Sequence, residues 1–134
     1  MILRGGLIMS NITHCEVIVK DDFENILVVQ KKVVKNEPKL WSLVGKNKKV
    51  NETLDKCVHR ILKEELKTIG FDIKEFATYK INDEESNIVF TCVLREKVSC
   101  HTSIVGWEWI SKKDLEKYNF IESDKLILDD YWEI

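Results

Sequence analysis

Short hydrophobic runs separated by polar segments make up most of the chain and predict a β-rich domain. The runs at 15–19 and 26–30 flank a polar stretch, which is the pattern of two strands joined by a turn. The run at 87–94 is the richest in β-branched residues. The predicted strands cover 15–19, 26–30, 40–44, 76–81, 87–94 and 105–110.

One long segment has helical spacing instead. Between Glu52 and Ile69, apolar residues recur every three or four positions and form one face that packs on a sheet. Asn51 suits an N-cap, and Gly70 is expected to end this helix. Two shorter helices are predicted over 111–118 and 123–132. Strands on either side of a central helix predict an α+β fold, an α/β/α sandwich with a mixed β-sheet between helices.

The length and the N-terminus indicate how the chain is organised. A chain of 134 residues with 44% hydrophobic content fits one ordinary domain. The first residues are apolar, but the stretch is too short to span a bilayer and two glycines interrupt it. We predict a disordered leader over 1–10 and a single domain over 11–134, with Met9 as an alternative start.

The net charge indicates which partners the chain does not favour, and the cysteines indicate its redox compartment. The net charge is only -2 and both signs are mixed along the chain, so nothing favours bulk attraction to nucleic acid or to an anionic membrane. Any phosphate contact must therefore be local. The four cysteines form no CxxC pair, which fits reduced thiols in a cytoplasmic protein. The oligomeric state stays open.

The central helix carries the candidate chemistry. Glu64 and Glu65 are adjacent carboxylates, and Arg60 reaches Glu64 one helical turn away. Magnesium, with manganese as an alternative, binds to one or two carboxylates together with waters and substrate phosphate oxygens, so this pair predicts a metal site. The plainer interpretation is a solvated helix face on which Arg60 simply pairs with Glu64.

The loop before the helix is the candidate phosphate-binding segment. Gly45, Lys46 and Lys48 precede the helix N-terminus, where backbone amides and the helix dipole favour anions. These residues are candidates for contacts with a diphosphate. Solvation of the lysine run is the alternative.

These residues, taken together, resemble the Nudix hydrolase family. Its box runs Gly, five residues, Glu, seven residues, Arg-Glu, an aliphatic residue, any residue, Glu-Glu, any residue, Gly and an aliphatic residue. Five of the nine specified positions agree. The matching residues are Glu52, Arg60, Leu62, Glu64 and Glu65. The resemblance implies a Nudix fold and a small nucleotide-like diphosphate as ligand, with Glu64 and Glu65 as metal ligands. Glu52 and Arg60 would be supporting residues, and Glu52 would bridge to the arginine.

Four positions depart from the box. Lys46 and Lys67 stand at its glycines, Thr68 at its last aliphatic residue, and Ile61 at a glutamate that contributes to the metal site in the family. Ile61 is therefore expected to lie against the metal ions, and the late Gly70 to lengthen the helix. Several family members add an acidic residue before the last strand. The nearest substitutes here are Glu96 and Glu84–Glu85.

Two functions from different classes follow. The first is a magnesium-dependent hydrolase of a nucleoside diphosphate linked to another moiety, made weak or atypical by Ile61. The second is a non-catalytic Nudix-fold module that binds a nucleotide or a protein partner. A fold-level resemblance does not choose between them, because function depends on the site.

Overall fold

A computed structural model describes residues 2–3, 11–94 and 96–134. Within these residues, eight strands form one sheet, accompanied by two α-helices and a short 3-10 helix. The strands are β1 (Ile2–Leu3), β2 (Asn11–Lys20), β3 (Ile26–Lys31), β4 (Trp41–Ser42), β5 (Val44–Asn47), β6 (Gly70–Lys80), β7 (Glu85–Leu94) and β8 (Ile104–Ile110). The helices are α1 (Leu54–Leu66), η1 (Lys112–Lys117) and α2 (Glu122–Tyr131).

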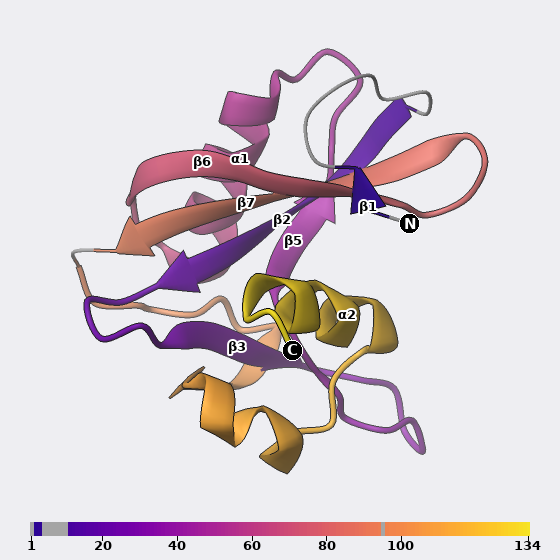
Figure 1. The fold of residues 1–134 in the computed structure, drawn as a ribbon. Helices are drawn as coiled ribbons and strands as arrows, with labels where there is room; N and C mark the ends of the chain where they lie inside the picture. The colour runs from indigo at the N-terminus through magenta and orange to yellow at the C-terminus, as the bar shows by residue number, and fades with distance from the viewer. Residues whose placement is uncertain (1, 4–10, 95) are drawn as a thin grey trace.

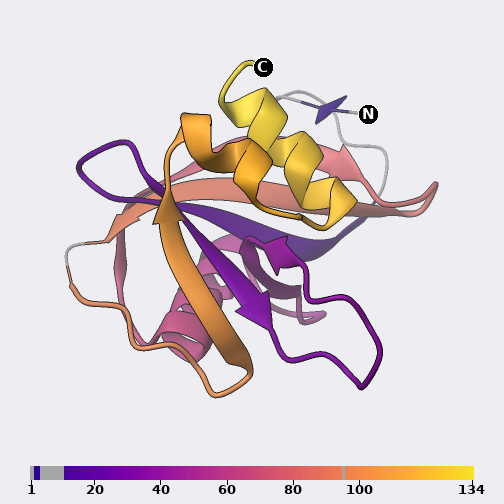
Figure 2. The same cartoon turned by 90° about the horizontal axis from the view of Figure 1, so that it is seen from below.

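The sheet is mixed and lies between the two α-helices. Its strand order is β1-β6-β7-β2-β3-β4, with β5 also paired to β2 and β8 to β3. β2 and β7 run parallel, whereas the other pairs are antiparallel. α1 covers one face of the sheet and α2 the other (Figures 1 and 2). The predicted α/β/α sandwich is confirmed.

β2 is the central strand, and its alternation separates two hydrophobic cores. Successive side chains of a strand point to opposite faces. Val17 and Val19 accordingly pack in the core that contains the buried face of α1, whereas Ile18 packs in the core beneath α2. Glu16 has the same parity as Ile18, so the sequence places a carboxyl group on the α2 face of a buried strand.

The ends of α1 differ from those predicted. Thr53, not Asn51, is the N-cap, and its side chain accepts a hydrogen bond from the Lys56 amide. The helix ends at Leu66, because Lys67 adopts the left-handed conformation (φ 52°). Gly70 does not cap the helix. It begins β6, where a Cβ would lie 2.5 Å from Leu62 Cδ1, so its role is close packing.

Ile61 is not against the metal-ligand face, which corrects the expectation from the resemblance. Its side chain is fully buried in the core between α1 and the sheet, in the same cluster as Leu62 and Leu66. The helix therefore turns Glu64 and not Ile61 to the surface. Position 61 belongs to the core of this chain. The glutamate of the family is therefore replaced by a side chain that packs in the core, and not by an apolar side chain beside a ligand.

The other predicted elements are found with shifted bounds. The strand predicted at 40–44 is divided into β4 and β5, and β6 begins at Gly70, before the predicted start at residue 76. The helix predicted over 111–118 is the 3-10 helix η1, and Ser111 and Asp114 form capping contacts at its start. Of the predicted leader, Ile2–Leu3 pair with β6, and residues 1 and 4–10 lie outside the described residues.

Replacing Lys67 by glycine is expected to stabilise the protein. A non-glycine residue in the left-handed region costs about 1 kcal/mol, which Lys67→Gly would recover. Lys63→Gly, a matched change inside the last helical turn, should instead destabilise by about 1 kcal/mol. Urea unfolding of both variants measures the difference. A Lys67→Gly variant less stable than the native chain would contradict the assigned helix end.

Ile61→Glu is expected to disrupt the core rather than create a metal ligand. An unpaired carboxylate at this fully buried position should lower the free energy of unfolding by about 3 kcal/mol or more. Ile61→Val, which keeps the site apolar, should cost about 1 kcal/mol. Urea unfolding checks both. Native stability in Ile61→Glu would show that this side chain reaches solvent.

Candidate functional site

An arginine–glutamate fork fixes the loop between β5 and α1. Arg60 Nε donates to Glu52 Oε2 at 2.7 Å and its Nη2 donates to Glu52 Oε1 at 2.9 Å. Nη2 also donates to the Asn47 carbonyl at 2.8 Å, and Glu52 Oε1 accepts from the Lys49 amide at 3.1 Å. The fork lowers the pKa of Glu52 to about 2. The loop is thus held by two side chains that match the Nudix box, and both act on the backbone around them.

Glu64 and Glu65 project from α1 toward two lysines of the sheet. Lys31, at the end of β3, donates from Nζ to Glu65 Oε1 at 2.8 Å. Lys46, in β5, places Nζ 3.1 Å from Glu64 Oε1 and 3.8 Å from Glu65 Oε1. Lys46 lowers the pKa of Glu64, with a smaller contribution from Arg60. Each carboxylate therefore has a cationic partner supplied by this chain.

The donor set at this position does not fit a divalent cation. The described part of the chain contains no group of three or more Asp, Glu, His or Cys side chains that could hold a metal ion. Magnesium needs only one or two protein carboxylates, but here both carboxylates already contact ammonium groups, which repel a cation. The predicted magnesium or manganese site on Glu64 and Glu65 stays a prediction.

The remaining candidates lie in different places. Gly45 lines the hollow beside Lys31, and a Cβ at this position would lie 2.6 Å from Glu16 Cγ, so its small size allows β5 to approach β2. Lys48 Nζ turns back to the carbonyls of its own loop, Lys49 and Val50.

The acidic substitutes also lie elsewhere. Glu96 lines a separate hollow with Lys63 and Lys67. In the β6–β7 turn, Glu85 accepts a hydrogen bond from the Asn82 side chain. The structure therefore brings neither substitute to Glu64 and Glu65.

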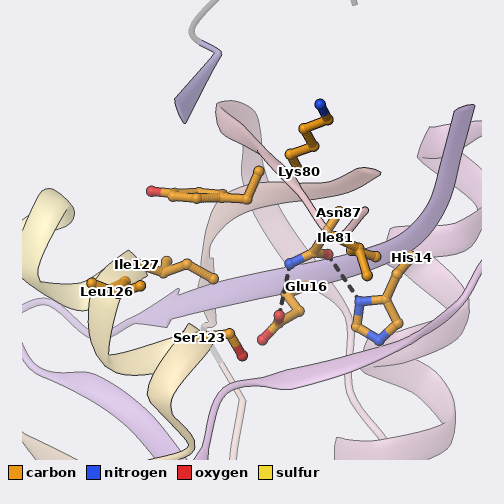
Figure 3. Close-up of a pocket in the computed structure, with 9 residues that line it drawn as sticks. His14, Glu16, Lys80, Ile81, Asn87, Ser123, Leu126 and Ile127 are labelled. Atoms are coloured by element: carbon orange, nitrogen blue, oxygen red, sulfur yellow. Dashed lines mark hydrogen bonds between the residues drawn. The ribbon is translucent and has the colours of Figure 1, made fainter. Parts of the chain in front are cut away.

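A chain of polar groups lies on the α2 face of the sheet. His14 and Asn87 are paired across β2 and β7, and His14 Nδ1 donates to Asn87 Oδ1 at 2.9 Å. Asn87 Nδ2 donates to Glu16 Oε1 at 2.8 Å. Figure 3 shows the Asn87 amide between His14 and Glu16, with Ser123, Leu126 and Ile127 of α2 facing them. The hollow has polar groups at its base and apolar side chains on its walls.

Glu16 shares its proton with Asp124, the buried carboxyl group of α2. Burial and the hydrogen bond with Asp124 raise the pKa of Glu16 well above its ordinary value. Burial also raises the pKa of Asp124, although its hydrogen bonds with Glu16 and the Leu43 amide oppose that rise. The Leu43 amide donates to Asp124 Oδ2 at 3.0 Å. The raised pKa of Glu16 favours its protonated form, which can donate this proton to Asp124 and so join β2 to α2.

Three neighbouring hollows share lining residues and follow one another along the sheet. The hollow of Figure 3 shares His14, Glu16 and Ser123 with a second hollow that reaches Gly45 and Lys31. Lys31 in turn lines a third hollow with Lys46, Glu64, Glu65, His101 and Ser103. We call this whole surface the α2–α1 cleft, with a polar-apolar end at α2 and a charged end at α1.

Sequence reasoning missed five residues of the cleft: His14, Glu16, Lys31, Asn87 and Asp124. Glu16 did carry a signal, because it is the single charged residue within a run that is otherwise apolar from Cys15 to Val19. A charge in the middle of a buried strand requires a partner. Lys31 carried none, since the contact with Glu65 joins residues 34 positions apart.

The sheet, the acidic helix and the Arg60–Glu52 fork together define a class of protein, and comparison with known families identifies it. The model of the NUDIX domain matches residues 14–131. The chain belongs to the Nudix family, and the resemblance predicted from the box is confirmed. A search of curated proteins finds no match to the chain.

Solved structures share the fold at low sequence identity. A MutT structure, from work on Aliivibrio salmonicida and Vibrio cholerae, has 15% identity and a TM-score of 0.77, covering 90% of this chain and 96% of that one. The NUDIX domain of Shewanella oneidensis NrtR, complexed with ADP ribose, has 16% identity and a TM-score of 0.70, covering 95% and 89%. A bifunctional NMN adenylyltransferase/ADP ribose pyrophosphatase from Francisella tularensis, complexed with AMP and a manganese ion, has 19% identity and a TM-score of 0.68, covering 92% and 41%.

The part of the chain that the structure describes contains no helix long and apolar enough to cross a membrane.

The Glu16–Asp124 pair is expected to make stability depend on pH. As pH rises from the ordinary glutamate pKa toward the raised pKa of Glu16, the unfolded chain releases a proton that the folded chain retains, so stability falls. Glu16→Gln removes this proton, and its stability relative to the native chain should rise by up to roughly 1.4 kcal/mol per pH unit within that window. Urea unfolding from about pH 5 to about pH 8 measures it. Exposed Glu37→Gln is the control, and equal pH profiles for Glu16→Gln and native protein would contradict the shared proton.

Proposed function

We propose that this Nudix-family protein binds a nucleoside diphosphate linked to another moiety, with the ligand lying along the α2–α1 cleft. The observation that carries the proposal is the continuity of the cleft, which joins an end suited to a ring with an end suited to phosphate. The ADP ribose bound by the NrtR domain is a ligand of this chemical class, and the AMP in the Francisella structure contains its nucleoside and one phosphate.

The α2 end suits the nucleoside. Ligand sites combine mostly apolar walls with a few polar groups that fix orientation. Here Leu126 and Ile127 supply the wall, and the Asn87 amide and the Glu16 carboxyl supply donors and acceptors. Asn87 carries two donors and two acceptor positions, and its contacts with His14 and Glu16 use one of each. The unused pair matches the donor and acceptor edge of a heteroaromatic ring.

The α1 end suits the diphosphate. Lys31 and Lys46 both line it, with side chains 40% and 32% exposed. Glu65 lies behind Lys31 and is only 5% exposed, so a ligand entering this end meets an ammonium group before it meets that carboxylate. Along the cleft, the groups suited to a ring come first and the lysines follow. The nucleoside and the diphosphate follow each other in the same order in the proposed ligand.

Slow hydrolysis of the same ligand is a second candidate function. It is favoured by the intact fork between Arg60 and Glu52 and by the adjacent Glu64 and Glu65, which occupy the family positions. Ammonium contacts on both glutamates oppose it. We expect binding to be readily measured. Turnover should lie far below the range of roughly 1 to 1,000 per second that is typical of enzymes.

The binding proposal is tested at the apolar wall of the α2 end. Leu126 is 57% exposed, so Leu126→Glu should fold normally and place a carboxylate where the ring would lie. The expected result is a loss of ADP-ribose affinity of about tenfold or more by calorimetry, equal to about 1.4 kcal/mol. Ile69→Glu is the matched control, since Ile69 is similarly exposed and lines a hollow outside the cleft.

Three outcomes decide between the functions. Equal loss in the Leu126 and Ile69 variants would refute the proposed position of the nucleoside. No binding of ADP-ribose, nucleoside triphosphates, nucleotide sugars or dinucleoside polyphosphates would refute the proposed ligand class. Native turnover of any of them at an ordinary enzymatic rate with magnesium or manganese, abolished by Glu65→Gln, would replace the binding role by hydrolysis.

A further inference from the structure

We propose that the ammonium groups of Lys31 and Lys46 bind the ligand's diphosphate directly, in place of a divalent cation. The inference deepens the proposed function and rests on it for the identity of the ligand. It arises from the mismatch between a family that is expected to use a metal and a charged end whose two carboxylates hold lysines of the same chain.

At the charged end, each of the two glutamates has a lysine of the sheet against it. Lys31 and Lys46 approach Glu65 and Glu64 from two neighbouring parts of the sheet, β3 and β5, at 2.8 Å and 3.1 Å. Two ammonium groups and two carboxylates sum to zero charge, and the adjacent Arg60 and Glu52 cancel each other as well. A divalent cation would meet two ammonium groups in contact with its ligands, and a diphosphate would meet the same two carboxylates, so the net charge favours neither and the remaining ammonium donors decide. For the cation to bind, both lysines would have to leave.

The ammonium groups of Lys31 and Lys46 can donate more hydrogen bonds than the two glutamates use. An ammonium group has three donors. Lys31 Nζ donates to Glu65, and Lys46 Nζ lies 3.1 Å from Glu64 Oε1 and 3.8 Å from Glu65 Oε1. Donors therefore remain on both groups for phosphate oxygens. Because Glu65 is buried and Lys31 is 40% exposed, the carboxylate orients the ammonium group and the ammonium group faces the cleft.

The loop before β8 adds neutral groups at the same end. His101 and Ser103 line it with the lysines, and the His101 amide donates to the Glu65 carbonyl at 2.8 Å, which fixes the loop to the end of α1. The Ser103 amide donates to His101 Nδ1 at 3.0 Å, so Nδ1 is an acceptor and the ring proton of the neutral form lies on Nε2. This loop occupies the position where an additional metal-binding carboxylate was sought, and it supplies an imidazole and a hydroxyl group.

Glu65→Gln separates direct binding from metal-mediated binding, because the two predict opposite signs. If ammonium groups bind the anion, removing the Glu65 charge frees Lys31, and affinity for inorganic pyrophosphate should stay equal or rise. If a metal on Glu65 binds the anion, affinity should fall. Isothermal calorimetry with inorganic pyrophosphate is the measurement, once with EDTA and once with excess magnesium. We expect binding in EDTA that magnesium does not strengthen.

Lysine variants test the two residues themselves. Lys31→Met leaves the buried Glu65 carboxylate without its partner, so the double variant Lys31→Gln with Glu65→Gln is used beside it to keep a neutral, hydrogen-bonded pair. This double variant and Lys46→Met should each lose about tenfold or more in pyrophosphate affinity. Lys48→Met is the matched control, because Lys48 lies two residues after Lys46 but donates to the carbonyls of its own loop. It should lose about threefold or less, from long-range charge alone.

The outcomes also separate this inference from the proposed function. Pyrophosphate binding that requires magnesium, or that falls in Glu65→Gln, overturns the direct contact, and ADP-ribose binding with magnesium would then leave the proposed ligand class standing. Equal losses in the Lys48, Lys46 and Lys31 variants overturn it too, as a general charge effect. Absence of both pyrophosphate and ADP-ribose binding under all conditions would refute both proposals.

Discussion

The central strand β2 is the constraint on which the rest of the structure depends. It pairs with β3, β5 and β7, and its residues from Cys15 to Val19 are buried. A strand with neighbours on both edges and helices over both faces leaves no route to solvent for a charged side chain. Glu16 is the one such side chain in this run. Its burial therefore favours the protonated carboxyl group and requires hydrogen-bond partners. These partners are Asn87 and Asp124.

This requirement links the core to the cleft. Asp124 belongs to the first turn of α2. Its contact with the buried Glu16 carboxyl group therefore also holds this end of α2 against the sheet. Gly45 permits β5 to lie against the same residue from the other side, since a Cβ there would overlap Glu16 Cγ. The Tyr79 hydroxyl donates to Asp130 Oδ2 at 2.9 Å near the other end of α2, so the helix is held to the sheet at both ends, and the hollow beside it has Glu16 at its polar base.

The sequence predicted the layers well and the site only in part. Periodicity was sufficient for α1, whose apolar face packs as expected, because helical spacing reports directly on burial. It misplaced both helix ends, since capping depends on backbone conformation: Lys67 is left-handed although glycine is the residue that suits this position. The family resemblance, and not periodicity, assigned Ile61 to the ligand face. The family pattern aligned that position with a carboxylate, whereas the rotation of the helix over the sheet places it in the core.

Pairings across the fold explain what the sequence left out. The charged end joins β3, β5 and the end of α1, and the polar chain joins β2, β7 and α2. The contacts of Lys31 with Glu65, Glu16 with Asn87 and Leu43 with Asp124 span 34, 71 and 81 positions. The predicted bridge from Glu52 to Arg60 was accessible because both residues flank one loop and both belong to the family pattern. Lys31 belongs to no such pattern, and only the sheet register, which sets it opposite Ile104, carries it to Glu65.

The matching positions of the Nudix box therefore have two separate meanings in this chain. Glu52, Arg60 and Leu62 hold the loop and the helix, and they would do so with any ligand chemistry. Glu64 and Glu65 determine the chemistry, but their effect is set by whichever cation stands against them. An ammonium group offers directed donors and a single charge, whereas a divalent cation offers coordination and Lewis acidity. A chain can keep the first set intact, and with it the fold, while a lysine outside the box changes what the second set does. Family membership follows from the first set, and reaction chemistry has to be argued from the second together with Lys31 and Lys46.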